Sequence, residues 1–247
     1  MRVLKIVAEG LTTSFRYPHF MQGMHPTFEM PPPATIYGHI SSALGEWVSP
    51  EGVQFAYHFT YRTKVDDVEH IHVLTASKGK LPGTRLPKVL KGAVNPFKRT
   101  LLFKPRLVLY LNKIEWEPAF HSPRYAVVLG RSQDLLTYTS ISVVDLMKSE
   151  RAYFECTLAP YRMALQTARG YAVLMPRFLD YNNNRAPVFA RYIVLHKRVH
   201  SDEFLRFSNF PAETYWVDPT TPVVRDAHLG LLFHTFVGDD EETLHMA

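Results

Sequence analysis

Residues 30–45 read Met-Pro-Pro-Pro-Ala-Thr-Ile-Tyr-Gly-His-Ile-Ser-Ser-Ala-Leu-Gly. The apolar residues of this stretch recur at the three- and four-residue spacing of a helix: Ile36, Tyr37, Ile40, Ala43 and Leu44. The three prolines end any extended segment before it, Thr35 is a candidate N-cap, and Gly45 is a helix stop. The pattern therefore predicts one well-defined helix near the beginning of the chain.

Strand-like segments flank this helix on both sides. Val3 to Ala8 predicts an opening strand, whereas residues 11–30 lack a clean period and predict an irregular loop. Gln54 to Arg62 places an aromatic ring at every second position, which is typical of a strand with one aromatic face. Glu69 to Thr75 and Leu101 to Leu111 predict two further strands. The order strand, helix, strand, strand, excursion, strand predicts an α+β fold with a ferredoxin-like or RNA-recognition palm.

The excursion before the last of these strands is strongly basic. From His70 to Lys113 the chain contains no acid, and it contains ten cations: Lys78, Lys80, Arg85, Lys88, Lys91, Lys98, Arg99, Lys104, Arg106 and Lys113. Glycines and prolines recur through the same stretch, which favours loops and short extended pieces over a helix. We therefore predict a long, flexible basic insertion in the palm, at about residues 76–104.

The positive charge of the protein is concentrated in this insertion. The whole chain has 28 basic and 23 acidic residues, so without the ten cations 18 basic residues remain against 23 acidic ones, a balance of −5. A concentrated cationic strip can replace the counterions around a polyanion and hold its phosphates. The sequence thus points to nucleic acid, and the alternative is an ordinary solvated loop whose charges bind nothing.

Composition narrows the class of protein. A chain of 247 residues with 46% hydrophobic and 21% charged residues is a folded protein. Its single cysteine, Cys156, excludes an internal disulfide framework and a cysteine-rich zinc site. The first residues carry charge too early for a signal peptide, and no apolar window reaches the ~20 residues of a membrane span. We expect a cytoplasmic protein without a cofactor or a bound metal.

The second half of the chain predicts a different organisation. From about Ile141 onward the pattern is rich in strands: Tyr171 to Met175, Phe189 to Leu195, and Leu229 to Phe236. Residues 182–184, three consecutive asparagines, predict a turn. We place a domain boundary near residue 145, with the palm in residues 1–145 and a small β-rich domain in residues 146–247.

Two short segments outside the insertion have the chemistry to hold RNA. Phe15 could stack on a base while Arg16 pairs with a phosphate; the alternative is a buried phenylalanine beside a solvated arginine. In the segment 129–132, Gly130 lets the backbone approach a ligand closely, next to the guanidinium of Arg131 and the hydroxyl of Ser132. A glycine turn without a ligand would have the same sequence.

The chain lacks the motifs of common enzymes, including phosphate-binding loops, dinucleotide-binding glycines and a nucleophile elbow. His70 and His72 would share one face of a strand, but no third metal ligand can be assigned, so we interpret them as a surface pair. Metal-independent RNA cleavage needs groups that move protons beside a cation. Residues eligible for that role are His72, His121, Tyr61 and Lys104. Their spacing singles out no catalytic set, and we assign no catalytic residue.

Several segments together resemble the Cas-five family, the CRISPR-associated subunit that binds the crRNA 5′ handle in type I Cascade complexes. They are Gly10-Leu-Thr-Thr-Ser-Phe-Arg-Tyr-Pro18, residues 30–45, Leu129-Gly-Arg-Ser-Gln-Asp-Leu135 and, more weakly, Met175-Pro176 with Arg185-Ala-Pro187. The resemblance is close over about the first 140 residues and loose beyond them. It implies a ferredoxin-like palm with a thumb inserted before its last strand, followed in many members by a small β domain.

The resemblance also implies a function. A Cas-five subunit caps the crRNA 5′ handle and links the Cascade backbone subunit to the large subunit, in antiviral defence or RNA-guided DNA targeting. Its partners would be crRNA and these two subunits, with target DNA reached indirectly through guide pairing. The predicted RNA-binding residues are Phe15, Arg16, Lys78, Lys80, Arg85, Lys88, Lys91, Lys98, Arg99, Lys104, Arg131 and Ser132. The motif positions Pro33, Thr35, Tyr37 and Gly38 are interpreted as architectural.

Two other functions stay open. The helix motif looks closest to the binding-only subtypes, I-B in particular, but in subtype I-C the Cas-five subunit itself cuts precursor crRNA without metal. The chain could therefore be a metal-independent endoribonuclease. It could also be a scaffold whose basic insertion binds an acidic protein and no RNA.

Overall fold

The computed structural model describes residues 1–20, 23–167, 169–205, 214–238 and 243–245. Its centre is an antiparallel sheet with the strand order β17-β4-β7-β1-β8. These strands are β1 (Arg2–Gly10), β4 (Gln54–Thr60), β7 (Arg106–Leu111), β8 (Leu136–Asp145) and β17 (His234–Thr235). The helix α1 (Pro33–Leu44) joins β1 to β4, and the short α2 (Glu117–His121) lies between β7 and β8. The order β8-β1-β7-β4 with two intervening helices is ferredoxin-like, so the predicted α+β class is confirmed.

The helix α1 forms as its sequence predicts, except at its first residue. Pro33 occupies the first turn and Pro32 precedes it as the N-cap, so the helix begins before Thr35 and the predicted Thr35 cap is wrong. Proline suits this position because its fixed φ is helical and its missing N–H would be unpaired there. At the other end Gly45 adopts a left-handed φ of 86° and donates its N–H to the carbonyl of Ser41, which confirms the predicted stop.

The central sheet is buried on both faces. On one face, Leu4, Tyr57 and Leu109 pack with Ile36 and Ile40 of α1. On the opposite face, a second set of buried residues packs against strands from the second half of the chain: Val3, Val7, Val108 and Tyr110 from the sheet, with Tyr153, Leu229 and Leu231. This alternation along each strand is expected for a sheet between two layers.

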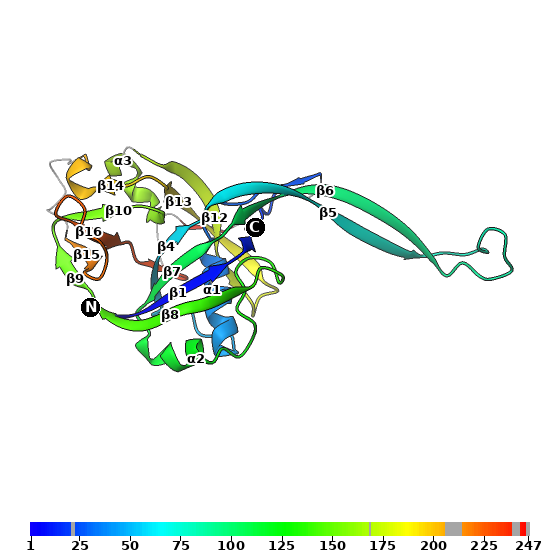
Figure 1. Ribbon diagram of the computed structural model, residues 1–247, viewed down its shortest axis with the longest axis horizontal. Helices are drawn as coiled ribbons and strands as arrows, with labels where there is room; N and C mark the ends of the chain where they lie inside the picture. The colour runs from blue at the N-terminus through cyan, green and yellow to red at the C-terminus, as the bar shows by residue number, and fades with distance from the viewer. Residues whose placement is uncertain (21–22, 168, 206–213, 239–242, 246–247) are drawn as a thin grey trace.

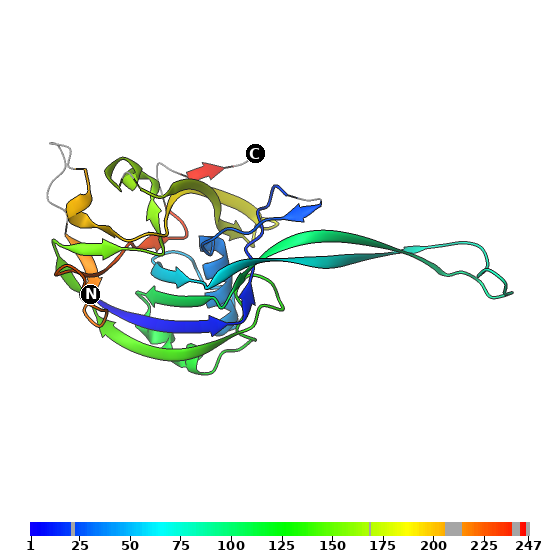
Figure 2. The same ribbon diagram turned by 45° about the horizontal axis from the view of Figure 1, so that its top comes forward.

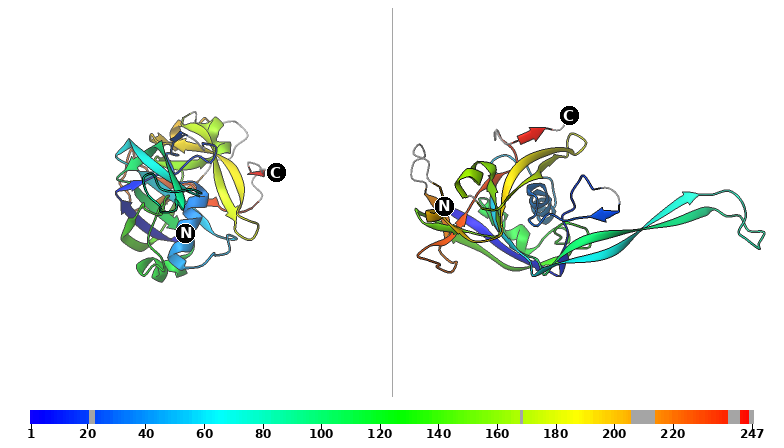
Figure 3. Two further views of the ribbon diagram at one scale, coloured as in Figure 1. Left: turned by 90° about the vertical axis from the view of Figure 1, so that its right-hand side faces the viewer. Right: turned by 90° about the horizontal axis from the view of Figure 1, so that it is seen from above.

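The basic insertion is a long β-hairpin. Its strands β5 (Thr63–Ala76) and β6 (Leu90–Phe103) pair antiparallel over 14 residues each, from Thr63 opposite Phe103 to Ala76 opposite Leu90. The hairpin projects far from the body, away from the N-terminus (Figures 1 and 2), and the right-hand view of Figure 3 shows the same projection from above. The expectation of loops and short extended pieces is therefore wrong for residues 90–103, and it holds for the tip, residues 77–89.

Two further expectations about this region are corrected. The strand predicted from Leu101 to Leu111 is two strands, because Lys104 turns with a positive φ of 52° before Pro105. The hairpin lies between β4 and β7, the second and third strands of the palm, whereas the resemblance placed the thumb before the last strand, which is β8. Pro96 lies inside β6, where it is opposite His70 of β5 and where β3 does not pair with β6. At this point β6 is an edge strand, and edge strands tolerate proline.

The second half of the chain forms two more sheets. One has the order β14-β10-β16-β15-β9 and covers the back of the palm: β14 (Val199–His200), β10 (Ala152–Phe154), β16 (His228–Leu231), β15 (Tyr215–Asp218) and β9 (Met147–Ser149). The other contains β11 (Thr157–Pro160), β13 (Ala186–Leu195), β12 (Tyr171–Asp180) and β18 (Thr243–His245). The predicted β-rich pattern and the asparagine turn are confirmed. Met175 and Tyr192 share the main core with Leu109, and the domain boundary near residue 145 stays a prediction.

The remaining elements are short. The strands β2 (Thr12–Thr13) and β3 (Met24–His25) pair with β6 at the base of the hairpin. The small helical elements are η1 (Ile114–Trp116), η2 (Tyr161–Met163), α3 (Ala164–Thr167) and η3 (Ser201–Glu203). Among the described residues, none of the helices has the length and apolar character needed to cross a bilayer.

Candidate nucleic-acid interface

A pocket of about 680 Å³ opens where the hairpin leaves the palm. Separate stretches of chain line it: Ser14 to Arg16 and Pro18, the first half of α1 with Pro32, Arg99 of β6, Val128 to Arg131, and the β12–β13 hairpin. These are the stretches on which the family resemblance rests, together with the base of the insertion. Segments far apart in the sequence thus meet around one concave surface.

Four of the pocket-lining residues are arginines: Arg16, Arg99, Arg131 and Arg185. None of the described residues that line the pocket is acidic. Arg16 is exposed, and no ion pair joins it to another described residue. Guanidinium groups bind phosphate through two parallel hydrogen bonds, so this lining suits an anionic ligand with phosphate groups.

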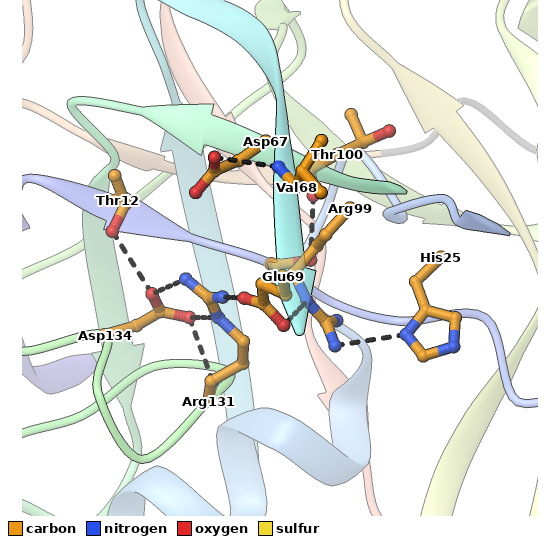
Figure 4. Close-up of polar contacts among 10 residues, drawn as sticks. Thr12, His25, Asp67, Val68, Glu69, Arg99, Thr100, Arg131 and Asp134 are labelled. Carbon is orange, nitrogen blue, oxygen red and sulfur yellow. Dashed lines mark hydrogen bonds and ion pairs between the residues drawn. The ribbon is translucent and has the colours of Figure 1, made fainter. Parts of the chain in front are cut away.

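Two of these arginines, Arg99 and Arg131, are held by carboxylates that are not part of the pocket lining, and Figure 4 shows these contacts. Arg131 donates to Asp134 from Nε at 2.9 Å and from Nη2 at 2.7 Å, and it donates to Glu69 from Nη1. Glu69 also accepts a 2.7 Å hydrogen bond from Nε of Arg99. Hydrogen bonds from its guanidinium to Asp134 raise the pKa of Arg131 above its ordinary value. Glu69 therefore ties the base of the hairpin to the loop that carries Arg131.

The loop from Leu129 to Asp134 is folded tightly around Asp134, which is fully buried. Asp134 also accepts a hydrogen bond from Thr12 at 3.2 Å. Gly130 has a φ of 97°, and a Cβ there would lie 2.6 Å from the carbonyl oxygen of Ser14. The chain just after β2 therefore passes too close to Gly130 for any larger residue, and this packing explains the glycine without a bound ligand.

The other sequence-predicted palm residues lie near the pocket in different ways. Phe15 is 3% exposed and packs edge-to-face on Phe59 with ring centroids 5.6 Å apart, so its ring faces the core. Phe15 is thus buried and Arg16 exposed, and both line the pocket, so the RNA-binding role of the pair stays a prediction. Ser132 is exposed and lies outside the pocket lining.

The hairpin separates its cations into two groups. Near the base, the opposite strand supplies acids, and Lys98 pairs with Asp66 at 2.8 Å while Arg99 pairs with Glu69. Toward the tip, five cations form no ion pair with any described residue: Lys78, Lys80, Arg85, Lys88 and Lys91. Lys104 lies exposed in the turn before β7. Acids of β5 thus neutralise the cations at the base of the hairpin, and the cations without an acidic partner are near its tip.

Sequence reasoning included Met175-Pro176 and Arg185-Ala-Pro187 as a weak part of the resemblance but assigned no RNA contact to the β12–β13 hairpin. Its turn puts Asn184 and Arg185 in left-handed conformations, with φ values of 50° and 58°, and the guanidinium of Arg185 lies 5.3 Å from the ring centroid of Tyr181. Asparagine is a residue that adopts this conformation readily, so the asparagine run is a signal for the turn. It does not indicate that the next residue reaches a pocket formed by the first half of the chain.

The residues considered for acid–base cleavage do not meet. His72 lies on β5, His121 ends α2 beside Glu117, and Lys104 is in the turn before β7. Tyr61 lies instead near a different cluster, in which Glu29 contacts Lys64, His196 and the hydroxyl of Tyr171. Within the described ranges, no group of three or more His, Cys, Asp and Glu side chains could hold a metal ion.

Comparison with known proteins finds similarity in structure alone. No family model and no curated protein matches this chain. A chain of a CRISPR RNA-guided surveillance complex is similar, with a TM-score of 0.50 and 14% identity over 84% of this chain and 95% of that chain. A CRISPR protein from Archaeoglobus fulgidus has a TM-score of 0.41 and 10% identity, over 87% of this chain and 90% of that one. A chain of the type III-B Cmr-beta complex bound to cognate target RNA has a TM-score of 0.43 and 13% identity, over 82% of this chain and 87% of that one. At these identities the likeness establishes the fold, which is that of a chain of a CRISPR RNA-guided surveillance complex.

Proposed function

We propose that this protein is an RNA-binding subunit of a CRISPR effector complex, and specifically the type I subunit that caps the 5′ handle of crRNA. The observation that carries the proposal is the pocket at the base of the hairpin, where four arginines from separate segments converge without an acid in the lining. The shared fold with a chain of an RNA-guided surveillance complex supports the same assignment.

The pocket has features for both parts of a nucleotide. Arg16 and Arg185 are cations for the phosphate, and Pro32, Pro187 and Phe189 form an apolar wall for sugar and base. Single-stranded RNA is bound by this combination of phosphate contacts and flat apolar surfaces against splayed bases. In this proposal the pocket holds a handle nucleotide, while the free cations near the hairpin tip contact the RNA backbone further along the strand.

The proposed protein partners are the Cascade backbone subunit and the large subunit. The distal hairpin is the surface that supports an assembly role, because it exposes apolar side chains beside its cations: Leu74, Leu86, Val89 and Leu90 are all more than half exposed. Apolar side chains that project from the body of a protein are commonly covered by a partner. Target DNA would be read by guide pairing, with protein contacts to backbone and shape.

Binding of labelled single-stranded RNA of about 15 nucleotides, measured by fluorescence anisotropy, tests the RNA-binding part of the proposal. We expect Arg16→Ala to weaken binding by roughly 10- to 150-fold, since a charge-assisted hydrogen bond contributes roughly 1.5–3 kcal/mol. The matched control is Arg225→Ala, because Arg225 is also exposed but pairs with Glu203 on the back of the molecule. Absence of RNA binding at low salt would overturn the proposal and favour the scaffold that binds an acidic protein.

One observation favours a second candidate function, metal-independent cleavage of precursor crRNA. Tyr61, Lys64, Tyr171 and His196 gather around Glu29 where β5 leaves the palm. A histidine and a lysine can supply the proton transfers and charge stabilisation that such cleavage needs. Incubation of labelled repeat RNA with the protein in EDTA tests this candidate: cleavage at one position, lost in His196→Ala, would support it, and intact RNA would exclude it.

A further inference from the structure

We propose that Trp47, stacked on Tyr181 at the rim of the arginine-lined pocket, is a stacking site for an RNA base next to the nucleotide that the pocket holds. This inference rests on the proposed RNA-binding function and adds a second contact to it. Nothing in the family motifs includes Trp47, which lies just after the end of α1.

The exposure of Trp47 is the first observation. Its side chain is 54% exposed, although an indole gains more from burial than almost any other side chain. One side of the indole is occupied by Tyr181, with ring centroids 3.3 Å apart and planes at 23°, and Tyr37 lies 6.0 Å away in a nearly parallel orientation. The indole is thus held by two aromatic rings while much of its surface stays accessible.

The position of the stack is the second observation. Tyr181 and Arg185 line the pocket, and the guanidinium of Arg185 lies 5.3 Å from the Tyr181 ring centroid. Arg185, Tyr181 and Trp47 therefore form a continuous series that begins in the pocket and ends at the exposed indole. A strand whose phosphate contacts Arg185 would bring its neighbouring base to the ring of Trp47.

A nucleobase fits this site better than a protein side chain for two reasons. The site presents a flat ring and not an apolar groove, and stacking of bases on such rings is tolerant of sequence. The adjacent charge is positive, with Arg16 and Arg185 at the same pocket, which complements a phosphate backbone. An apolar peptide would gain little from these cations.

The test compares Trp47→Leu with Trp47→Phe in the full chain, using the labelled single-stranded RNA described above. Leucine keeps the apolar character but has no ring to stack, whereas phenylalanine keeps a flat ring. We expect Trp47→Leu to weaken binding by roughly 5- to 150-fold, the range for removal of one base–aromatic stack, and Trp47→Phe to restore most of the affinity. The slope of log affinity against log salt should stay unchanged, because no phosphate contact is removed.

Trp216→Leu is the matched control. Trp216 is also partly exposed and lies 5.3 Å from the ammonium of Lys148, in the sheet on the back of the palm. If Trp47→Leu binds like the wild type, or if both Trp47 variants lose affinity in parallel with their melting temperature, the stacking site is refuted while RNA binding stands. If the wild type itself fails to bind RNA, the proposed function and this inference fall together.

Discussion

Replacing Asp134 by asparagine tests the network at the base of the hairpin. Asp134 has no exposed surface and accepts four hydrogen bonds: one from Thr12 and three from Arg131, of which one comes from the backbone N–H. Removing one partner of a buried charged pair typically costs 3–5 kcal/mol. Arg131 keeps Glu69 as a second partner, so we expect Asp134→Asn to lower the free energy of unfolding by about 3 kcal/mol, the lower end of this range.

Thermal unfolding measures this loss. For a chain of this size about 1 kcal/mol corresponds to roughly 2–4 °C, so Asp134→Asn should lower the melting temperature by about 6–12 °C. The control is Glu115→Gln, since Glu115 is 61% exposed and lies 3.9 Å from Lys113, and it should stay within about 0.5 kcal/mol of the wild type. A combined Arg131→Met and Asp134→Leu variant should lose less unfolding free energy than the two single variants lose together, because neither charge of the pair is then left without the other. A wild-type melting temperature for Asp134→Asn would refute the view that this network holds the hairpin base.

Three further measurements follow from the structure. Burial lowers the pKa of His39, although its hydrogen bond to the carbonyl of Val128 opposes that shift. The stability that neutral His39 contributes should therefore be present above its pKa in the unfolded chain, near 6.5, and be lost as pH falls below that value. In His39→Gln the free energy of unfolding should fall less between pH 7 and pH 5 than in the wild type. Gly130→Ala should cost about 1–3 kcal/mol in chemical denaturation, and more than Gly52→Ala, whose Cβ would meet open space. If about four of the hairpin cations contact phosphate, log affinity for single-stranded RNA should fall with log salt at a slope near −3, and neutralising Lys78 and Lys80 together should reduce that slope by about 1.4, whereas an unchanged slope would exclude both as contacts.

The palm was predictable because its signals are local. The spacing of Ile36 and Ile40 and the stop at Gly45 define α1 without reference to the rest of the chain. The strand β4 follows in the same way from the aromatic residues at its alternate positions, although the folded protein buries β4 on both faces. Periodicity over a few residues was sufficient for each of these elements.

The hairpin was not predictable in the same way, because pairing outweighed composition. Gly92 and Pro96 suggested interruption, yet both lie within β6, opposite Leu74 and His70 of β5. The sequence also suggested that the cations of this stretch have no acidic partners. In the structure Glu69 and Asp66, which precede the stretch, accept hydrogen bonds from Arg99 and Thr100 across the strands. Contacts of this kind depend on register, which the sequence alone does not specify.

The candidate site was predicted in part for a related reason. Arg16 and Arg131 were identified from their motifs, and both line the pocket. Tyr181 was not identified, and Arg185 was quoted only as part of the resemblance, because both enter the site through the packing of β12 against α1, in which Tyr37 meets Phe178 edge-to-face at 4.9 Å. A pocket wall that arises from long-range packing cannot be predicted from a local sequence pattern.

The length of the hairpin makes the protein a candidate molecular ruler. Arg99 of the pocket and the free cation Lys91 are eight residues apart on β6, so at about 3.3 Å per residue they stand roughly 26 Å apart, and the other free cations lie farther out toward the tip. Two contact regions at a fixed span bind a ligand with avidity only when the ligand reaches both of them. An RNA too short to cover this distance would have the affinity of one region alone, so a plot of affinity against oligonucleotide length should rise in a step and not in proportion to length.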